Sequence, residues 1–440
     1  MRATGSWSVP PDRVELRFTD KKPAYSKAEA FAEASRCLYC YDAPCTRACP
    51  TSIDIASFIH KIATGNYRGS ARTILLSNLL GASCARVCPV EVLCEGACVY
   101  TEWGRKPIEI GRLQRFAMEQ GRSADLLPRQ AAKDESIGLV GGGPASLACA
   151  GTLALLGYET VIYEKSELPG GLNLSGVAPY KIRAEEVLQE VEFIQSLGVK
   201  IQTDAELGRD FSGEELLAKH AAVFFAPGLG ADSLRGVPGA DGSSVVGAVD
   251  WIEDMKLRSE AALKGVSSAV VVGGGNTALD VVQELASLGI PEVTLVYRRS
   301  EEKMPGYRHE WERAKEKRVR LLAEVAVSEI HRDSAGKMHS ISLVRTENGR
   351  PTEEAAGELP CELIVVATGQ ERLASLAALF PQVQCDEKGR VMADPETMAT
   401  GNPRVFTGGD CYNGGKEVVN AVDDGQRAAR AIDRLLRGEN

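Results

Sequence analysis

Two segments of the chain repeat one local arrangement, and this repeat constrains the fold more than any other feature. Residues 137–148 (IGLVGGGPASLA) and 269–280 (AVVVGGGNTALD) each read as a short apolar strand, a glycine-rich turn and the start of a helix. Glycines in such a turn let backbone amides approach a pyrophosphate at the helix N-terminus. We therefore expect two dinucleotide-binding folds of the α/β class in one chain.

The first of these sites carries the acidic residue that its pattern requires. Gly141 and Gly143 form the turn, and Glu164 is the last residue of the strand TVIYE, about 20 residues further on. An acid at this position accepts hydrogen bonds from the ribose hydroxyls of a bound dinucleotide. Ser146 stands where glycine or alanine is usual, and we expect looser packing of the helix there. The alternative is a glycine-rich turn without a ligand.

The second site differs at the end of its second strand, EVTLVY. Arg298 and Arg299 stand there in place of an acid. Two cations at this position suit the 2′-phosphate of NADP, so the pattern favours NADP(H) over NAD(H). The alternative is a pair of solvated surface arginines.

Two later segments also read as strands. Residues 362–370 (ELIVVATGQ) end in a glycine turn, and residues 404–410 (RVFTGGD) precede a helix that begins near Val418. Two dinucleotide folds with such returning strands are typical of two-nucleotide flavoprotein reductases, which hold FAD in one site and NAD(P)H in the other. Asp410 would then contact the ribityl or phosphate part of FAD. A simple strand-to-helix turn is the alternative.

The cysteines are concentrated at the N-terminal end. Eight of the twelve precede residue 99, and they are Cys37, Cys40, Cys45, Cys49, Cys84, Cys88, Cys94 and Cys98. The start of the chain has no apolar leader, so we expect a cytoplasmic, reducing location, where clustered cysteines bind metal more often than they form disulfides. Zinc sites use paired C-x2-C knuckles, and only one occurs here. The run from Cys37 to Pro50 is closer to the ferredoxin spacing and favours two iron–sulfur clusters, with zinc as the alternative.

The cysteine segment also has a helical pattern. Ile53, Ile55, Phe58, Ile59 and Ile62 recur at helical spacing before a stop signal at residues 65–66. The segment is expected to end in the polar stretch 121–135. The predicted architecture is an α-helical iron–sulfur domain (1–130), followed by two interleaved Rossmann-like domains. These are a discontinuous FAD domain (131–238 and 361–440) and an NAD(P)H domain (239–360).

Composition narrows the set of partners. The net charge of −9 argues against binding to nucleic acid or to acidic membranes, and no apolar run reaches the roughly 18 residues of a membrane span. The five histidines form no metal-binding pair, and we expect no catalytic side chain beyond those that hold cofactors. Proteins and small cofactors are the expected partners.

Several motifs together carry a family resemblance. The stretches CLYCYDAPCTRACP, GASCARVCPVEVLCEGACV, IEIGRLQRF, DPETM and VFTGGDCYNGGKEVVNAV resemble the N-terminal half of dihydropyrimidine dehydrogenase and the electron-input subunit of the bacterial two-subunit enzyme. The resemblance runs from about residue 25 to residue 435. The small subunit of glutamate synthase shares the architecture, and YRRSEEKMPG resembles that relative about as well.

The resemblance implies a set of cofactor ligands. It places one 4Fe-4S cluster on Cys37, Cys40, Cys45 and Cys98, and a second on Cys49, Cys88, Cys94 and Gln114. Cys84, one helical turn before Cys88, is the alternative to Gln114 as the fourth ligand of the second cluster. The matched FAD positions are Gly141, Gly143, Pro144, Ala145, Glu164, Lys165, Gly170, Gly171, Leu172, Lys181, Gly409 and Asp410, where Lys181 replaces a family arginine. The matched NAD(P)H positions are Gly274, Gly275, Asn276, Thr277, Arg298, Arg299, Ala367, Thr368 and Gly369.

The resemblance also implies an activity. FAD converts the two-electron hydride of NAD(P)H into single electrons for the clusters. The chain has no room for a barrel of roughly 250 residues, so FMN and the reversible reduction of uracil or thymine to the 5,6-dihydropyrimidine are expected on a partner, in a heterotetramer. The alternatives are a glutamate synthase small subunit, a bifurcating transhydrogenase subunit and a non-enzymatic scaffold. A disulfide reductase is disfavoured because no C-x2-C follows Cys40.

Overall fold

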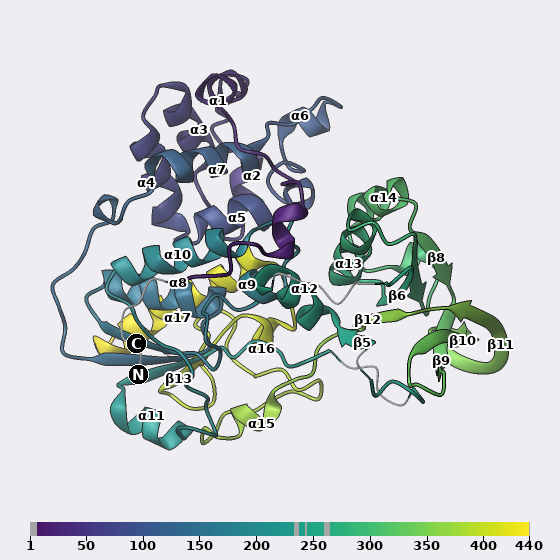
Figure 1. Cartoon of the computed structure of the whole chain (residues 1–440). Coiled ribbons are helices and arrows are strands. Elements are labelled where there is room, and N and C mark those ends of the chain that lie inside the picture. The colour runs from purple at the N-terminus through teal and green to yellow at the C-terminus, as the bar shows by residue number, and fades with distance from the viewer. Residues whose placement is uncertain (1–6, 233–236, 243, 259–264, 440) are drawn as a thin grey trace.

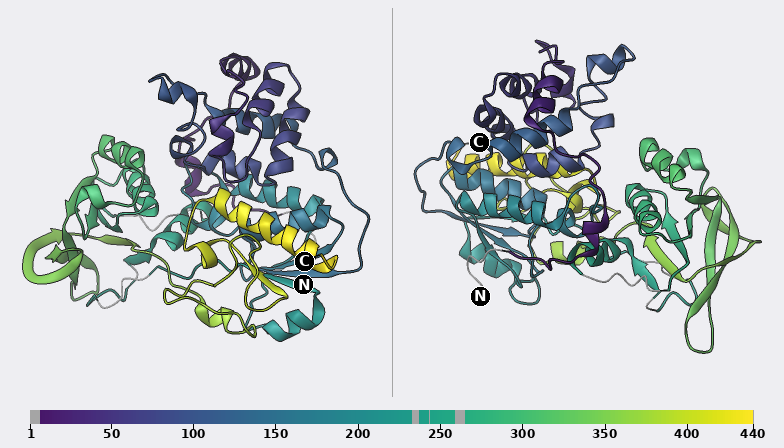
Figure 2. Two further views of the ribbon diagram at one scale, coloured as in Figure 1. Left: turned by 180° about the vertical axis from the view of Figure 1, so that it is seen from behind. Right: turned by 45° about the horizontal axis from the view of Figure 1, so that its top comes forward.

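The computed structural model describes residues 7–232, 237–242, 244–258 and 265–439, and it divides into three parts (Figure 1). An N-terminal group of helices lies on a first α/β domain, and a second α/β domain stands to one side. The long C-terminal helix lies between the first sheet and the N-terminal helices, as the views in Figure 2 also show. No helix among the described residues is long and apolar enough to span a membrane.

The N-terminal domain is helical, as its sequence predicts. Its helices are α1 (Lys27–Ala34), α2 (Pro44–Arg47), α3 (Ile55–Ala63), α4 (Tyr67–Ser77), α5 (Gly81–Val87), α6 (Val99–Glu102) and α7 (Ile110–Gly121), with short 3-10 turns η1 (Val14–Arg17), η2 (Val90–Val92) and η3 (Ala124–Leu126). The apolar residues predicted at helical spacing are buried. The predicted stop between α3 and α4 is confirmed, and Asn66 caps α4 by accepting a hydrogen bond from the Gly69 amide.

The first α/β domain is built on five parallel strands in the order β13-β4-β1-β2-β3. The strands are β1 (Ser136–Val140), β2 (Glu159–Tyr163), β3 (Lys200–Gln202), β4 (Ala222–Phe225) and β13 (Val405–Thr407). The helices are α8 (Pro144–Leu155), α9 (Leu172–Ser175), α10 (Ala184–Ser196), α11 (Gly213–Lys219), α15 (Ala374–Ala377), α16 (Asp410–Asn413) and α17 (Val418–Leu436). The predicted strand, turn and helix are confirmed, and β13 returns to this sheet as expected.

The second α/β domain has its own parallel sheet, in the order β5-β12-β6-β7-β8. Its strands are β5 (Val245–Gly247), β6 (Ser268–Gly273), β7 (Glu292–Tyr297), β8 (Arg320–Ala323) and β12 (Leu363–Ala367). Its helices are α12 (Ala248–Leu257), α13 (Asn276–Ser287) and α14 (Arg308–Glu316), with the 3-10 turn η4 (Glu301–Lys303). An antiparallel sheet of β9 (Val325–Arg332), β10 (Met338–Glu347) and β11 (Arg350–Pro360) is inserted before β12.

The predicted boundary between residues 360 and 361 is wrong. Strand β12 pairs with β6 and β5 in the second sheet, with Leu363 opposite Ala269, so the second domain continues through Ala367. The chain crosses back only afterwards, where the amide of Gly230 donates to the carbonyl of Glu371 and the two connections run side by side. An apolar strand that ends in a glycine turn fits either sheet, so local pattern alone could not assign it.

The predicted 1–130 domain also includes a segment that packs elsewhere. Val14 and Phe18, in and beside η1, are buried in the core of the second α/β domain together with Trp251 and Met255 of α12. The N-terminal segment therefore ties the second α/β domain to the rest of the molecule before the chain enters the helical domain.

Helices α8 and α17 pack closely because one position between them is glycine. A Cβ atom at Gly425 of α17 would collide with the carbonyl oxygen of Ala145, in the first turn of α8. Helix α8 begins directly after the first glycine-rich turn, so this close approach holds the turn against the C-terminal helix.

Gly425→Ala is expected to separate these helices. The added methyl group should lower the free energy of unfolding by about 1–3 kcal/mol, as overpacking does, and weaken retention of FAD. Thermal denaturation and the flavin absorbance of the purified protein measure both effects. Arg430→Ala, at an exposed position of the same helix, is the control and should change the stability by less than about 0.5 kcal/mol. Equal effects of the two variants would contradict this account.

Candidate functional site

A cavity of about 720 Å³ lies where the three parts of the molecule meet. Predicted FAD residues line it, namely Gly141, Gly143, Pro144, Ala145, Glu164, Lys165, Gly171, Leu172, Lys181, Gly409 and Asp410. Asn276 and Thr277 of the predicted NAD(P)H set line the same cavity. Residues from both glycine-rich turns thus face one space.

The first glycine-rich turn has the shape of a phosphate cradle. Gly141 has φ +91°, and a Cβ there would press on the carbonyl oxygen of Ala226. Gly143 is the N-cap of α8, whose first-turn amides have no side-chain cap. Gly170 does not line the cavity, but its amide donates to the carbonyl of Gly142 at 3.0 Å and holds the 170–172 turn against the first one. This geometry fits the pyrophosphate of FAD.

Glu164 lies at the end of β2 beside this turn, as predicted. Its buried carboxylate accepts hydrogen bonds from the Gly142 amide at 2.5 Å and the Ser166 amide at 2.8 Å. A carboxylate that lines the cavity at this strand end is suited to accept hydrogen bonds from ribose hydroxyls.

Asp410 brings a second carboxyl group to the cavity, at the start of α16. Burial raises the pKa of Asp410 to about 6, and Asp424 and Glu417 push it in the same direction, whereas the Lys416 amide and Arg372 oppose the rise. A carboxyl group with this pKa titrates near neutrality and can either donate or accept a hydrogen bond. That property suits contact with the polar part of a flavin.

The second glycine-rich turn lies at the start of α13. The side-chain oxygen of Asn276 accepts from the Tyr307 amide at 2.8 Å, and the carbonyl of Gly274 accepts from the Gly306 amide at 3.0 Å. Gly275 is the N-cap of α13, and a Cβ there would meet open space. The turn is therefore held by the loop that follows η4 and leaves room for a ligand.

The remaining NAD(P)H positions lie outside the shared cavity, at strand ends of the second sheet. Ala367 ends β12, and Thr368 and Gly369 follow it beside β6. Arg298 and Arg299 follow β7, are exposed, and form no ion pair with any described residue. Parallel strands that end at one edge of a sheet place these residues along the same edge as the glycine-rich turn.

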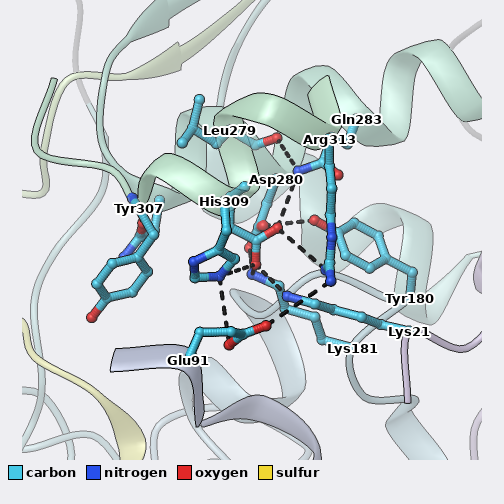
Figure 3. Close-up of polar contacts among 12 residues, drawn as sticks. Lys21, Glu91, Tyr180, Lys181, Leu279, Asp280, Gln283, Tyr307, His309 and Arg313 are labelled. Atoms are coloured by element: carbon cyan, nitrogen blue, oxygen red, sulfur yellow. Dashed lines mark hydrogen bonds and ion pairs between the residues drawn. The ribbon is translucent and has the colours of Figure 1, made fainter. Parts of the chain in front are cut away.

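Charged side chains join all three domains beside the cavity (Figure 3). Lys181 of the first α/β domain binds Asp280 of α13 at 2.6 Å and Glu310 of α14 at 3.2 Å. Lys21 of the N-terminal segment binds the same Glu310 carboxylate at 2.5 Å, and the Tyr180 hydroxyl donates to Asp280 at 2.7 Å. We call these five residues the interdomain ionic cluster.

The cluster extends to the helical domain through Glu91 of η2, which contacts His309 at 3.6 Å and Arg313 at 4.0 Å. Burial would raise the pKa of Glu310, but Lys181 and Lys21 lower it well below its usual value of 4.5. The charged carboxylate therefore stabilises the docked arrangement at neutral pH, and this contribution is lost only as the pH falls through the lowered pKa.

Sequence reasoning missed most of this cluster. The family resemblance predicts only a contact with FAD for Lys181, and the sequence predicts no role for Asp280, Glu310, Tyr180 or Lys21. One signal was available, because Asp280 is an acid among the apolar residues of the predicted helix in GGGNTALD. Its partners come from distant segments, so the sequence could not identify them.

Glu310→Gln should loosen the second α/β domain. Removing one partner from a buried ionic group costs about 1–3 kcal/mol, and we expect anaerobic flavin reduction by NAD(P)H to slow by roughly tenfold. Reduction by dithionite should be unchanged. Glu312→Gln, on the same helix with a half-exposed side chain that contacts Arg308 and Lys315, is the control. Stopped-flow absorbance at the flavin band measures both, and an unaffected Glu310→Gln would contradict the role.

The first predicted iron–sulfur ligand set lines one cavity. Cys37, Cys40, Cys45 and Cys98 surround it, and its other lining residues are mainly apolar, such as Ile55 and Ile110. Burial raises the pKa of Cys45 to about 11, with Cys37 adding to the rise. Four thiols in an apolar enclosure fit a metal cluster, whose positive charge deprotonates its ligands.

The second ligand set lies around the end of α5. Burial raises the pKa of Cys94 well above its usual value, and Glu95, Cys88 and Cys49 raise it further, so the three cysteines of this set interact electrostatically. Buried Gln114 donates from Nε2 to the carbonyl of Gly81 at 2.7 Å, and its Oε1 has no hydrogen-bond partner among the described residues. These residues fit a cluster with three thiolates and an amide oxygen.

Within the described ranges, no three His, Cys, Asp or Glu side chains are placed to hold a single metal ion. The fit to clusters therefore rests on the cavity lining and on the electrostatic coupling of the cysteines. The second set adjoins the large cavity, because Val87 and Pro89, on either side of Cys88, line it.

The fold and the site together define a class of protein, namely pyridine-nucleotide-linked flavoprotein oxidoreductases that carry an N-terminal 4Fe-4S domain. Residues 14–126 match the family described as dihydropyrimidine dehydrogenase domain II, 4Fe-4S cluster. Residues 136–425 match the pyridine nucleotide-disulphide oxidoreductase family.

Curated relatives match nearly the whole chain. The NAD-dependent dihydropyrimidine dehydrogenase subunit PreT of Escherichia coli K12 is 36% identical, covering 94% of this chain and 96% of the relative. The glutamate synthase [NADPH] small chain of the same strain is 31% identical, covering 96% and 94%. The chain therefore belongs to the family of dihydropyrimidine dehydrogenase subunits typified by PreT, and glutamate synthase small chains are related to it.

Solved structures show the same two-nucleotide fold. Mycobacterium tuberculosis FprA in complex with NADPH superimposes with a TM-score of 0.55 at 20% identity, covering 70% of this chain and 85% of that one. Thioredoxin reductase of T. acidophilum gives 0.54 at 19%, covering 68% and 98%. At this identity the similarity concerns the fold alone.

Proposed function

We propose that this chain is the electron-input subunit of a dihydropyrimidine dehydrogenase. It would oxidise NAD(P)H through FAD and pass electrons through two 4Fe-4S clusters to a partner that reduces uracil or thymine, in a reversible reaction. The observation that carries the proposal is the single cavity lined by both glycine-rich turns and flanked by the neighbours of Cys88. A cavity lined in this way would allow a hydride donor, a flavin and a cluster to lie in sequence.

The side chains act by holding the cofactors. When bound, FAD accepts a hydride and releases electrons singly to iron–sulfur clusters. Glu164 would accept the ribose hydroxyls, and the amides at the start of α8 would bind the pyrophosphate. Asn276 and Thr277 would orient NAD(P)H on the other side of the cavity. The ionic cluster, with Lys181, Asp280 and Glu310, would fix the distance between the two sites.

The order of the clusters follows from their positions. The Cys49, Cys88 and Cys94 set adjoins the large cavity through Val87 and Pro89, so it would receive electrons first. The set on Cys37, Cys40, Cys45 and Cys98 lines a separate cavity and would pass them on.

The nucleotide is proposed to be NADP(H). The named relatives differ, since PreT is described as NAD-dependent and the glutamate synthase small chain as NADPH-linked. The choice therefore rests on Arg298 and Arg299. Both are exposed at the end of β7 and form no ion pair with any described residue, so they are available to a 2′-phosphate.

The double variant Arg298→Ala/Arg299→Ala should lower kcat/KM for NADPH by about tenfold to a hundredfold, because hydrogen bonds to a charged group contribute about 1.5–3 kcal/mol. The value for NADH should change little. Steady-state reduction of an artificial acceptor gives both values. Lys303→Ala, at an exposed position of η4, should leave the ratio unchanged. An equal loss with both nucleotides would overturn the proposed preference.

The acceptor is proposed to be an FMN-containing barrel subunit, in a cytoplasmic heterotetramer without nucleic acid or membrane. The described residues form the two nucleotide folds and the helical domain, and the relative PreT is named as a subunit. A glutamate synthase or a transhydrogenase would use the same electron path with another acceptor.

Anaerobic purification of the tagged chain from its host tests this choice. A barrel-sized FMN subunit in constant ratio, with uracil-dependent oxidation of NAD(P)H by the complex, is the expected result. A much larger glutamine-binding subunit would replace the proposal with glutamate synthase. Failure of bound FAD to bleach with NAD(P)H would contradict an electron-input role altogether.

A further inference from the structure

A network of buried polar groups lies beside the second ligand set. The side chain of Asn78, which follows α4, is fully buried and donates from Nδ2 to Thr51 Oγ1 and to Cys84 Sγ, both at 3.3 Å. Its Oδ1 accepts from the Leu80 amide at 2.9 Å. Because Oδ1 accepts a hydrogen bond from a backbone N–H, the orientation of the amide is fixed, and the two Nδ2 protons point to Thr51 and Cys84.

The network then reaches one predicted cluster ligand. Thr51 Oγ1 lies 3.4 Å from Cys49 Sγ. Because Thr51 already accepts from Asn78, its own proton is free to point to Cys49. A thiolate that binds iron can only accept, so Thr51 would be the donor.

The two candidates for the fourth ligand differ in their contacts. The Cys84 sulfur accepts a hydrogen bond from Asn78 Nδ2 at 3.3 Å. Gln114 donates from Nε2 to the Gly81 carbonyl at 2.7 Å, and this bond orients the side-chain amide.

We propose that Asn78 and Thr51 form a hydrogen-bond relay to Cys49 that raises the reduction potential of the second cluster. The inference rests on the proposed function, because it assumes that a cluster is bound there. Hydrogen bonds to ligand sulfurs stabilise the reduced form, which carries the additional negative charge. A higher potential at the cluster beside the flavin cavity favours removal of electrons from the flavin.

Thr51→Val removes the hydroxyl and keeps the shape of the side chain. We expect the midpoint potential of the second cluster, measured by EPR-monitored redox titration of the intact protein, to become more negative while that of the first cluster is unchanged. Thr51→Ser keeps the hydroxyl and should restore the wild-type potential. Unchanged potentials in Thr51→Val, with wild-type iron content, would refute the relay and leave the proposed function intact.

Cys84→Ala tests the ligand set that the family resemblance implies, by iron and sulfide analysis. Gln114 as the fourth ligand predicts wild-type iron content in Cys84→Ala. Loss of half of the iron in Cys84→Ala would make Cys84 the ligand and overturn that set. Gln114→Ala should instead lose or alter the EPR signal of the second cluster alone. A wild-type protein that binds only one cluster after anaerobic reconstitution would contradict the proposed function itself.

Discussion

One buried carboxylate joins the cysteine helix to the flavin domain, and the placement of both centres depends on it. Glu190 of α10 accepts from the Ala82 amide at 2.9 Å and the Ser83 amide at 3.2 Å, and also from the Ser83 hydroxyl. These are the first amides of α5, which has no side-chain cap of its own. Burial raises the pKa of Glu190, and Arg122 and the Ser83 donors oppose that rise. The first turn of the helix that precedes Cys88 is therefore capped by a side chain of the neighbouring domain.

The two interfaces of the flavin domain differ in chemistry. The helical domain shares one apolar core with the first sheet, in which residues such as Leu79, Leu153 and Ile194 are buried together. The second α/β domain is attached beside the cavity by the interdomain ionic cluster, by two connecting segments and by a small apolar contact of Val14 and Phe18 with its core. Polar interfaces between domains permit relative motion more readily than large apolar ones. The predicted cluster ligands thus lie across the apolar interface, and the second dinucleotide fold lies across the more polar one.

The sequence predicts the structure of short segments correctly but not the contacts between segments that are far apart in the chain. Strand, turn and helix around Gly141 and around Gly275 follow from residues within one short window, and the eight clustered cysteines defined the helical domain in the same way. The assignment of β12 to the second sheet depends on pairing with β6, almost a hundred residues earlier in the chain. The partners of Asp280, Tyr180 and Lys181, likewise come from the first α/β domain, about a hundred residues earlier in the chain. Periodicity and motif spacing contain no information about such pairings.

The loop from Cys88 to Cys94 shows why these distant contacts matter for function. Its first residue ends α5, and buried Lys22 donates to the Cys88 carbonyl at 2.9 Å, which adds a cation beside the thiols. Its middle residue, Glu91, faces His309 and Arg313 of the second α/β domain. Charges interact strongly where burial excludes water. A displacement of the second α/β domain therefore changes the electrostatic surroundings of the same loop that carries two predicted cluster ligands, so the position of this domain and the charge around these cysteines are physically linked.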